Sequence, residues 1–422
     1  MVLFHAADLH LDSPLRGLGD YPATASMRGA TRRAFTAIVD RCRAERAVAL
    51  LLAGDIFDSD TRDMHAGLFF MAELSRLADV GTQVYVVRGN HDSAANAVSA
   101  ELAPPPHVHI YPHDRAATVV DHAHGIAVHG MSYPNRAAPD SLLPHYPPPV
   151  PGLLNIGLLH TNAVASPSHA PYAPTTIDAL LAHGYQYWAL GHVHEHRIHP
   201  AAGRWVVYPG NSQGRTIRET GPRGCVRIEV DASSRTIQAV TRVIVDVARW
   251  ERVVVDVGEA TSVADVHHRV AEALRIETDR AEGRPLACRL TLTGTGPGHG
   301  HVRKNPPLLH GQLRADAAAR TPPVCFERIQ IETRAPSGVP AEHGLRAELE
   351  RAAATYADDP AGLVVLMADE ISGLERAMKW AGPQGDEPQS DDHPRLEDPL
   401  WLRARLDGAR AAALRALLED PS

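Results

Sequence analysis

Short apolar runs recur along the first half of the chain, and most of them end directly in a polar residue. The run Ala47 to Ala53 ends in Gly54-Asp55, and runs at 3–7, 83–87, 155–159 and 185–190 end in polar residues too. Runs of this length with few polar positions are typical of buried strands. Open α/β sheets place their ligands at the carboxyl ends of strands. The pattern therefore predicts an α/β domain whose strand ends share one site.

Helical periodicity fills the intervals between these runs. Residues 27–46 repeat apolar positions with the period of an amphipathic helix, and residues 65–78 form a second such stretch. Further strands are expected at 125–131, 205–208 and 225–230. The proline-rich segment 144–151 is expected to be a spacer loop.

The pattern changes near residue 245. Strands at 253–257, 286–293 and 324–331 with a helix at 262–276 predict a small, separate α+β module. Beyond it, a segment rich in Pro, Gly, Asp and Gln is typical of a flexible linker, and Asp398-Pro399 is a helix start. We therefore expect a first domain at 1–245, a second at 246–335, a helical extension at 336–380, a linker at 381–394 and a C-terminal helix at 395–422.

Composition changes this picture only slightly. The 422 residues are 44% hydrophobic and 22% charged, as in ordinary soluble proteins, and the longest apolar run is too short to span a membrane. No secretory signal is visible, and the four cysteines are widely spaced, so we expect reduced thiols in a cytoplasmic protein. The net charge of −8 argues against a large sequence-independent nucleic-acid surface.

The polar residues at the strand ends are of the types that bind metal ions. Histidine, aspartate and asparagine without thiolates suit borderline or hard divalent ions such as Mn²⁺, Fe²⁺ or Zn²⁺. Their number exceeds one coordination sphere and fits two ions about 4 Å apart, the arrangement used in phosphoester hydrolysis. Asp55 is the expected bridge between one ion held by Asp8, His10 and His194 and another held by Asn90, His160 and His192.

This ordered set resembles the calcineurin-like metallophosphoesterase family. The matching motifs are Asp8-Leu9-His10, Gly54-Asp55-Ile56-Phe57-Asp58, Gly89-Asn90-His91-Asp92, His160-Thr161-Asn162 and Gly191-His192-Val193-His194. The resemblance implies an α/β fold, a four-layer αββα sandwich, here with the small C-terminal α+β module and C-terminal helices. It also implies that His91 is the catalytic acid that protonates the leaving oxygen, and that Asp92 holds the His91 imidazole.

Within the family, the chain is most similar to the SbcD-type DNA repair nucleases, and especially to the bacterial YhaO-like group. The phrases that carry this likeness include residues 5–14, 158–162 and 187–194. Leu290 to Gly294 followed by Leu309 to Leu313 looks like the DNA-capping domain of these nucleases. The resemblance implies a Mn²⁺-dependent exonuclease that acts on DNA in repair with an SMC-like ATPase subunit. It also implies a possible homodimer, formed by helices near the active-site motifs.

Several roles stay open at this point. Arg136 and Arg215 are the candidate phosphate contacts among the arginines that follow strand ends. Asp58 has either a packing role or a hydrogen bond to a ligand, and the glycine-rich stretch 294–307 is either a flexible loop or a phosphate-contacting one. The rival functions are a phosphatase or cyclic-nucleotide phosphodiesterase that acts on a small substrate, and a non-catalytic scaffold. The capping phrases argue against the first rival, and the intact ligand set with His91 argues against the second.

Overall fold

The computed structural model describes residues 1–336 apart from 14, 16, 19–21, 59–63, 94–102, 136–137 and 164–172, together with Ala354 and Gly408. The chain forms two compact units, residues 1–335 and 336–422. The predicted helical extension, linker and C-terminal helix lie outside the described residues, except for Pro336, Ala354 and Gly408. The predicted division of the first unit after residue 245 stays a prediction.

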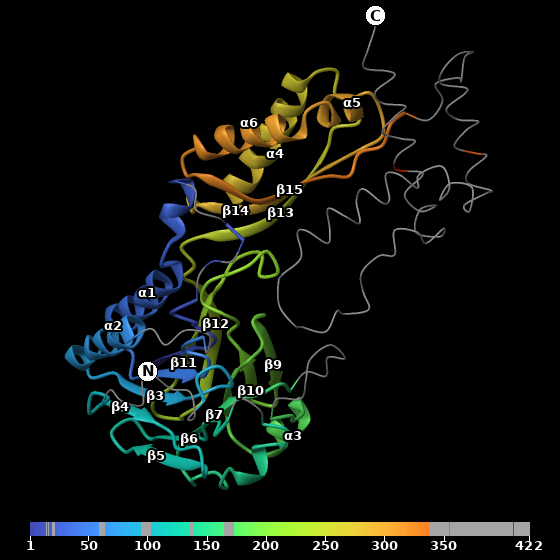
Figure 1. The fold of residues 1–422 in the computed structure, drawn as a ribbon. Helices are drawn as coiled ribbons and strands as arrows, with labels where there is room; N and C mark the ends of the chain where they lie inside the picture. Colours follow the sequence, from blue (N-terminus) through green and yellow to red (C-terminus); the bar gives the residue numbers. More distant parts are fainter. Residues whose placement is uncertain are drawn as a thin grey trace, which may run out of the picture. The chain divides into compact units, whose positions relative to one another are not determined.

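Two six-stranded sheets form the first part of the chain (Figure 1). The first has the order β12-β11-β1-β2-β3-β4, and β1 to β4 run parallel. Its strands are β1 (Val2–Ala6), β2 (Ala49–Ala53), β3 (Gln83–Val87), β4 (Val108–Ile110), β11 (Gly224–Val230) and β12 (Ile237–Ile244). The second has the order β5-β6-β7-β8-β10-β9. Its strands are β5 (Ala117–Asp121), β6 (Ile126–Gly130), β7 (Leu154–His160), β8 (Tyr187–Gly191), β9 (Arg197–Ala201) and β10 (Arg204–Tyr208).

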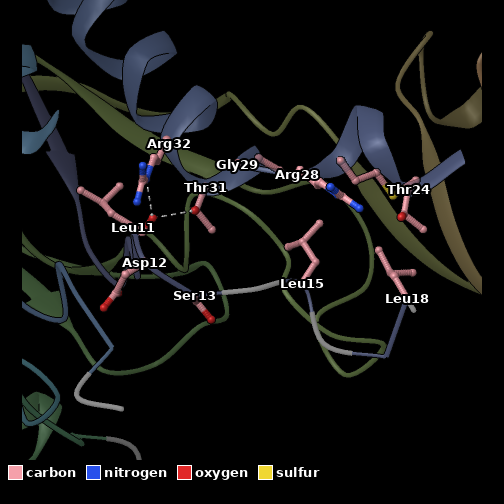
Figure 2. Close-up of a pocket in the computed structure, with 12 residues that line it drawn as sticks. Leu11, Asp12, Ser13, Leu15, Leu18, Thr24, Arg28, Gly29, Thr31 and Arg32 are labelled. Carbon is pink, nitrogen blue, oxygen red and sulfur yellow. Dashed lines mark hydrogen bonds between the residues drawn. The ribbon is translucent and has the colours of Figure 1, made fainter. Parts of the chain in front are cut away.

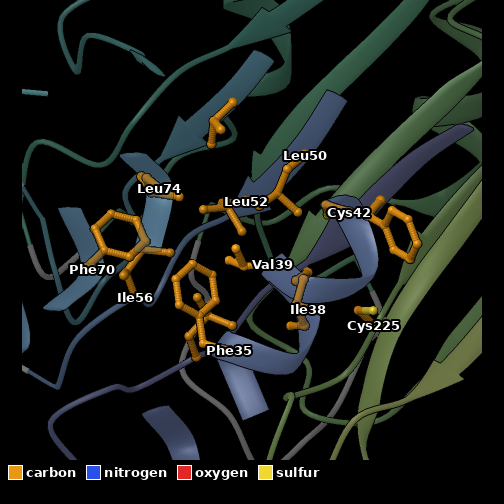
Figure 3. Packing of buried hydrophobic residues seen from close by; sticks show 14 of the residues in the cluster. Phe35, Ile38, Val39, Cys42, Leu50, Leu52, Ile56, Phe70, Leu74 and Cys225 are labelled. Atoms are coloured by element: carbon orange, nitrogen blue, oxygen red, sulfur yellow. The ribbon is translucent and has the colours of Figure 1, made fainter. Parts of the chain in front are cut away.

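Alternation along β2 shows how the layers are built. Leu50 and Leu52 point to one side of the first sheet, where they pack with Phe35 of α1 (Ala30–Ala44) and Phe70 of α2 (Met64–Ser75) (Figure 3). Leu51 points to the other side and joins a core that includes side chains from β6, β7, β8 and β10. The outer face of the second sheet is covered by loop residues and by α3 (Ile177–Ala182). The predicted α/β class with two sheets between helices is confirmed.

The strands that the sequence did not reveal are β4, β5, β9 and β12. Most of their side chains are only partly buried, and all four strands lie at the edges of the two sheets. An edge strand with a mixed surface carries no continuous apolar run, so its pattern resembles that of a loop.

The third part of the first unit is a parallel sheet of three strands with the order β13-β14-β15. Its elements are β13 (Arg249–Asp256), α4 (Val263–Arg280), β14 (Leu286–Thr293), α5 (Gly298–Arg303), α6 (Pro306–Ala318) and β15 (Val324–Ile331). The stretch 294–307, treated from the sequence as a loop, contains α5, and Val302 on that helix is fully buried in the module's core. In the part of the chain that the structure describes, no helix combines the length and apolar character needed to cross a membrane.

Trp250 of β13 connects this module to the loop between β10 and β11. Its side chain is fully buried against Met27 and Ala30, and its indole N–H donates to the carbonyl oxygen of Gly214 at 2.9 Å. The same loop carries Arg215 and Glu219 towards the strand ends. The three-stranded module therefore contacts, through Trp250, the loop between β10 and β11 that carries Arg215 and Glu219.

Candidate metal centre

Polar side chains from five strands of the two sheets meet at one place. Asp8 follows β1, Asp55 follows β2 and Asn90 follows β3, while His160 ends β7 and His192 follows β8. Because β1 to β3 are parallel neighbours, as are β7 and β8, their carboxyl ends lie together within each sheet. The predicted gathering of strand-end residues is thus present in the structure.

The side-chain distances divide this gathering into two overlapping groups around Asp55. His10 Nε2 lies 4.0 Å and His160 Nε2 3.5 Å from the same Asp55 oxygen, Oδ2. On the His160 side, Asn90 Oδ1 lies 3.0 Å from His160 Nε2 and 3.3 Å from His192 Nδ1.

On the His10 side, His194 Nε2 lies 4.0 Å from Asp8 Oδ1. Ligand atoms of Asp8, His10 and His194 all lie within 4.8 Å of one another, and so do those of Asp8, Asp55 and His160. The structure therefore brings together all seven predicted ligands, with Asp55 between the two groups.

Several of these residues have unusual backbone angles. Asp8, His10, Asp55 and His192 have φ values of 52°, 44°, 52° and 95°, in a region that residues with a side chain rarely adopt. Each such residue costs on the order of 1–3 kcal/mol and persists where surrounding contacts impose it. At Asp8 and His10 the backbone N–H groups donate to Gly54 O and Asp55 O at 3.0 Å and 3.1 Å, and His192 N donates to the Asp8 carboxylate. Strain gathered at one set of side chains is typical of a functional site.

Three ligand imidazoles are oriented in the same way. Nδ1 of His10 contacts Asp58 Oδ1 at 3.0 Å, that of His160 contacts the Ala53 carbonyl at 2.9 Å, and that of His194 contacts Glu219 Oε1 at 2.7 Å. An oxygen acceptor at Nδ1 fixes the tautomer and turns Nε2 towards a metal ion. His10 Nε2 is itself buried without a hydrogen-bond partner among the described residues. A buried ring nitrogen without a partner is costly, and a bound cation would remove that cost. The donor set and its orientation thus fit a pair of divalent ions.

The contacts of His91 correct one sequence-based assignment. Asp92 was expected to hold the His91 ring, but its two carboxylate oxygens accept backbone N–H groups of Gly89 and Ile56 at 2.7 Å and 2.8 Å. The carboxylate beside the ring is Asp58, whose Oδ1 lies 3.2 Å from His91 Nδ1. Side chains that are adjacent in a tight turn point in different directions. Asp92 therefore accepts hydrogen bonds from the backbone of the turn, and Asp58 contacts the His91 ring. The open question about Asp58 is answered by its contacts with His10 and His91.

Arg215 has a different setting from the one expected. Its side chain is 14% exposed and donates to Asp58 Oδ2 at 3.0 Å and to Ser13 Oγ at 3.3 Å, and it lies 3.6 Å from Glu219. These contacts make it a link between the two carboxylates that orient His10 and His194. Its predicted contact with substrate stays a prediction. Arg136, the other predicted phosphate contact, lies outside the described residues.

The charges around the centre keep the carboxylates of Asp55 and Glu219 ionised. Burial raises the pKa of Asp55, but the neighbouring histidines, His160 first, outweigh burial and lower that pKa to about 2. Burial likewise opposes ionisation of Glu219, yet the hydrogen bond from His194 lowers the pKa of Glu219 to about 2. Burial raises the pKa of Asp92 to about 6, helped by the charge of Asp55. The groups that face the centre are thus the ones held as anions, which favours cation binding.

Among the residues that the structure describes, Glu219 contacts the candidate centre although the sequence did not reveal it. It lies in an irregular loop, far along the chain from the ligand motifs, with no periodic pattern around it. The only signal is its position four residues after Arg215, in a loop that follows Pro209-Gly210-Asn211. That spacing alone is too common to mark a site.

Comparison with known proteins agrees with this geometry. Residues 1–196 match the calcineurin-like phosphoesterase family, and residues 250–334 match the middle domain of metallophosphoesterase YhaO. An uncharacterized metallophosphoesterase YhaO of Bacillus subtilis (strain 168) is 34% identical over 307 residues, which cover 70% of this chain and 72% of that protein. The DNA double-strand break repair protein Mre11 of Methanopyrus kandleri is 25% identical over 238 residues, 52% of this chain and 50% of its own length.

Solved structures similar to this chain include a dimetal phosphatase from Danio rerio. It has 14% sequence identity and a TM-score of 0.35, and the match covers 54% of this chain and 92% of that one. A protein of Thermus thermophilus has 12% identity and a TM-score of 0.34, with 57% and 98% covered. The sequence relationship to the Bacillus protein, together with the match of residues 1–196, identifies the family. The chain belongs to the YhaO-like metallophosphoesterases of the calcineurin-like phosphoesterase family.

Proposed function

We propose that the chain is a two-metal phosphodiesterase that hydrolyses DNA, as a Mn²⁺-dependent exonuclease in cytoplasmic DNA repair. The observation that carries the chemistry is the gathering of seven His, Asp and Asn side chains, six of them around Asp55, with His91 beside them. The choice of DNA is supported by the similarity to a relative named a DNA double-strand break repair protein.

The residues of the chain have separable tasks in this reaction. Bound ions would act as Lewis acids on the phosphate and would supply a nucleophilic water near neutral pH. The carboxylates of Asp8 and Asp55 would hold the ions, and Asp58 and Glu219 would keep the ligand rings of His10 and His194 in place. As water oxygen bonds to phosphorus, the bond from phosphorus to the leaving oxygen breaks.

His91 would supply the proton that the leaving oxygen needs. Its backbone N–H donates to Asp55 Oδ1 at 3.0 Å, and its Nδ1 is buried 3.2 Å from Asp58. The side chain is still 29% exposed, so a substrate can reach the ring. A proton transferred from Nε2 to the leaving oxygen completes the step, and such general acids contribute about 10²–10⁴-fold to the rate.

We also propose that the chain works with an SMC-like ATPase subunit and forms a homodimer. Both proposals rest on the resemblance to SbcD-type nucleases. Adding a candidate ATPase to the nuclease assay described next would test the first, and sedimentation of the purified protein would test the second.

The substrate class can be tested by offering end-labelled linear DNA and p-nitrophenyl phosphoesters side by side with Mn²⁺. His91→Ala should reduce DNA cleavage by about 10²–10⁴-fold and should affect the p-nitrophenyl esters less, because p-nitrophenolate leaves without a proton. The matched control is His113→Ala, since His113 is exposed and lies after β4.

Ester cleavage with untouched DNA, with and without a candidate ATPase, would favour the rival function on a small substrate. DNA cleavage that is equal in His91→Ala and wild type would mean that His91 is not the acid or that another nuclease is present.

A further inference from the structure

One residue of the three-stranded module contacts the loop between β10 and β11 at two places. The indole N–H of Trp250 donates to the Gly214 carbonyl oxygen at 2.9 Å, and the Trp250 carbonyl oxygen accepts the backbone N–H of Gly221 at 3.1 Å. Gly214 and Gly221 stand at the two ends of the stretch that contains Arg215 and Glu219. A single residue of the module therefore contacts both ends of that stretch.

Further hydrogen bonds join the same two segments. The Gln213 side chain is buried, and its amide nitrogen donates to the Ala248 carbonyl oxygen at 2.7 Å. Its amide oxygen accepts the backbone N–H groups of Val247 and Ala248 at 2.9 Å and 3.2 Å. Buried polar groups are costly to leave without their hydrogen bonds. The start of the loop is therefore fastened to the segment that leads into β13.

The Trp250 ring itself has a fixed place. It is fully buried in a cluster that also contains Met27, Ala30, Ala287 and Cys325. Side chains in a closely packed core keep one rotamer on the time average. The indole N–H therefore points steadily at the loop.

The helix that packs against this ring is also bound to the backbone beside the ligand His10. The Leu11 carbonyl oxygen accepts Arg32 Nε at 3.2 Å and the Thr31 hydroxyl at 3.4 Å, and both donors lie in the first turn of α1 (Figure 2). Ala30, which lies in the cluster with Trp250, begins the same turn. The surroundings of the ring thus reach one metal ligand through α1 as well as another through the loop.

The loop continues these contacts to the ligand His194. The backbone N–H of Arg215 donates to Glu219 Oε2 at 2.6 Å, and Glu219 Oε1 lies 2.7 Å from His194 Nδ1. A Cβ added at Gly214 would lie 2.6 Å from the Glu219 carbonyl oxygen and 3.0 Å from Trp250 Cδ1. Gly214 therefore lies between the indole ring and Glu219, and direct contacts lead from the indole to the His194 imidazole.

We propose that Trp250 is a positioning residue for the metal ion that the group around His194 would hold. Because it fixes both ends of the loop, it keeps the Glu219 carboxylate where that carboxylate orients the His194 ring. This inference rests on the two-metal centre of the proposed function and not on its DNA substrate. It gives the three-stranded module a task at the centre that is separate from any contact with substrate.

Two conservative variants test this role. Trp250→Phe removes the indole N–H and keeps most of the apolar side chain, and Gln213→Asn withdraws the side-chain amide from Ala248. Isothermal titration of metal-free protein would measure the Kd for Mn²⁺ that Glu219→Gln raises. We expect each variant to raise that Kd about threefold to tenfold, because each weakens the hydrogen bonds at the start of the loop. The matched control is Trp205→Phe, which should change Kd less than about twofold, since Trp205 packs against the core between the two sheets.

The same substitutions in a Glu219→Gln background separate positioning from a purely structural role. If Trp250 acts through Glu219, Trp250→Phe should change Kd less than about twofold once Glu219 has been replaced. A purely structural role would lower the urea midpoint of unfolding and would either leave Kd unchanged or raise it equally in both backgrounds.

A wild-type Kd in both variants would overturn the inference, and so would equal losses with and without Glu219. An unchanged Kd in Glu219→Gln would overturn it too, because Trp250 would then have nothing to act through. If wild-type protein binds no Mn²⁺, the metal centre of the proposed function fails, and this inference fails with it. If wild-type protein binds Mn²⁺ and the variants match it, the inference alone fails. DNA takes no part in the measurement, so a wrong substrate cannot be mistaken for a wrong positioning role.

Discussion

At the scale of single residues, the candidate metal centre includes two carboxylates that are not candidate ligands but contact the ligand histidines. Asp58 and Glu219 accept from Nδ1 of His10 and His194, and Arg215 lies between the two carboxylates. An imidazole held in this way needs little reordering when it binds a metal ion. The affinity of the centre is therefore expected to depend on residues from two separate loops, one after β2 and one between β10 and β11.

Glu219→Gln should weaken metal binding. The amide keeps the size of the side chain but removes the charge that holds the Nδ1 proton of His194, so we expect about 10- to 100-fold lower Mn²⁺ affinity. Isothermal titration of metal-free protein would measure it. Glu195→Gln is the control, because Glu195 lies next to His194 in sequence but its carboxylate is 68% exposed and pairs with Arg197. Equal affinity in Glu219→Gln and wild type would contradict the role of Glu219.

The same variant should change the pH dependence of metal binding. Burial lowers the pKa of His194, but the hydrogen bond to Glu219 and the charge of Asp8 outweigh it and raise that pKa above 6.5. A metal ion binds the neutral ring, so protons compete with it as the pH falls through this raised pKa. Removing the Glu219 charge lowers the pKa of His194, so the pH at which the Mn²⁺ affinity falls to half of its own high-pH value should move down in Glu219→Gln. A midpoint that stays in place or moves up would contradict this assignment.

That the seven candidate ligands lie together could be predicted from the sequence because each follows a recognisable strand or closes a short motif. The residues that orient them could not be predicted in the same way. Glu219 lies in an aperiodic loop, and its partner His194 is 25 positions away. The assignment of Asp92 to His91 failed for a related reason. Adjacency in sequence suggested a contact, while the turn directs the Asp92 carboxylate to backbone N–H groups.

At the scale of elements, the strand ends approach each other so closely that side chains are excluded. A Cβ added at Gly191 would lie 1.9 Å from the Ala53 carbonyl oxygen, and one at Gly89 would lie 2.3 Å from Asp55 Oδ1. These glycines therefore allow β2, β3 and β8 to bring their ligands into one centre. Glycine is needed at positions 89 and 191 because a side chain there would collide with neighbouring atoms.

Gly89→Ala should displace the Asp55 carboxylate. The added methyl group cannot coexist with Oδ1 in its present place, so we expect the loss of at least one bound ion and of phosphodiester hydrolysis. Metal analysis after dialysis would measure the first effect. Gly311→Ala is the control, because a Cβ on α6 at that position meets no atom within 4 Å. Full metal content in Gly89→Ala would contradict the steric argument.

Phe35→Ala tests the packing of α1 on the first sheet. Phe35 is fully buried and packs near Phe70 (Figure 3). Its ring centroid lies 5.5 Å from that of Phe70 and 6.5 Å from that of Phe69. Truncation should lower the free energy of unfolding by about 3–5 kcal/mol, measured by urea denaturation. Leu68→Ala on α2 is the control, with Leu68 54% exposed and an expected change of about 0.5 kcal/mol or less. A change below about 1 kcal/mol for Phe35→Ala would contradict this packing.

At the scale of the whole molecule, the sequence predicts buried strands better than edges. The runs that became β1, β2, β3, β7 and β8 are apolar on both sides because they lie between two layers. The edge strands and α5 carry mixed surfaces, and only the folded chain shows what covers them. The hydrogen bond from Trp250 to Gly214 could not be predicted either, because no local sequence pattern links a strand of one module to a loop of another.

The most direct measurement of the central claim is the number of metal ions bound per chain. Metal-free wild-type protein and the His160→Ala variant would be dialysed against Mn²⁺, and the manganese bound per chain would be measured by inductively coupled plasma mass spectrometry. Six candidate ligands around a shared Asp55 predict two ions in the wild-type protein and one in the variant, because His160 belongs to the group expected to hold the second ion. One ion or none in the wild type, under conditions where phosphodiesters are hydrolysed, would contradict a two-metal centre.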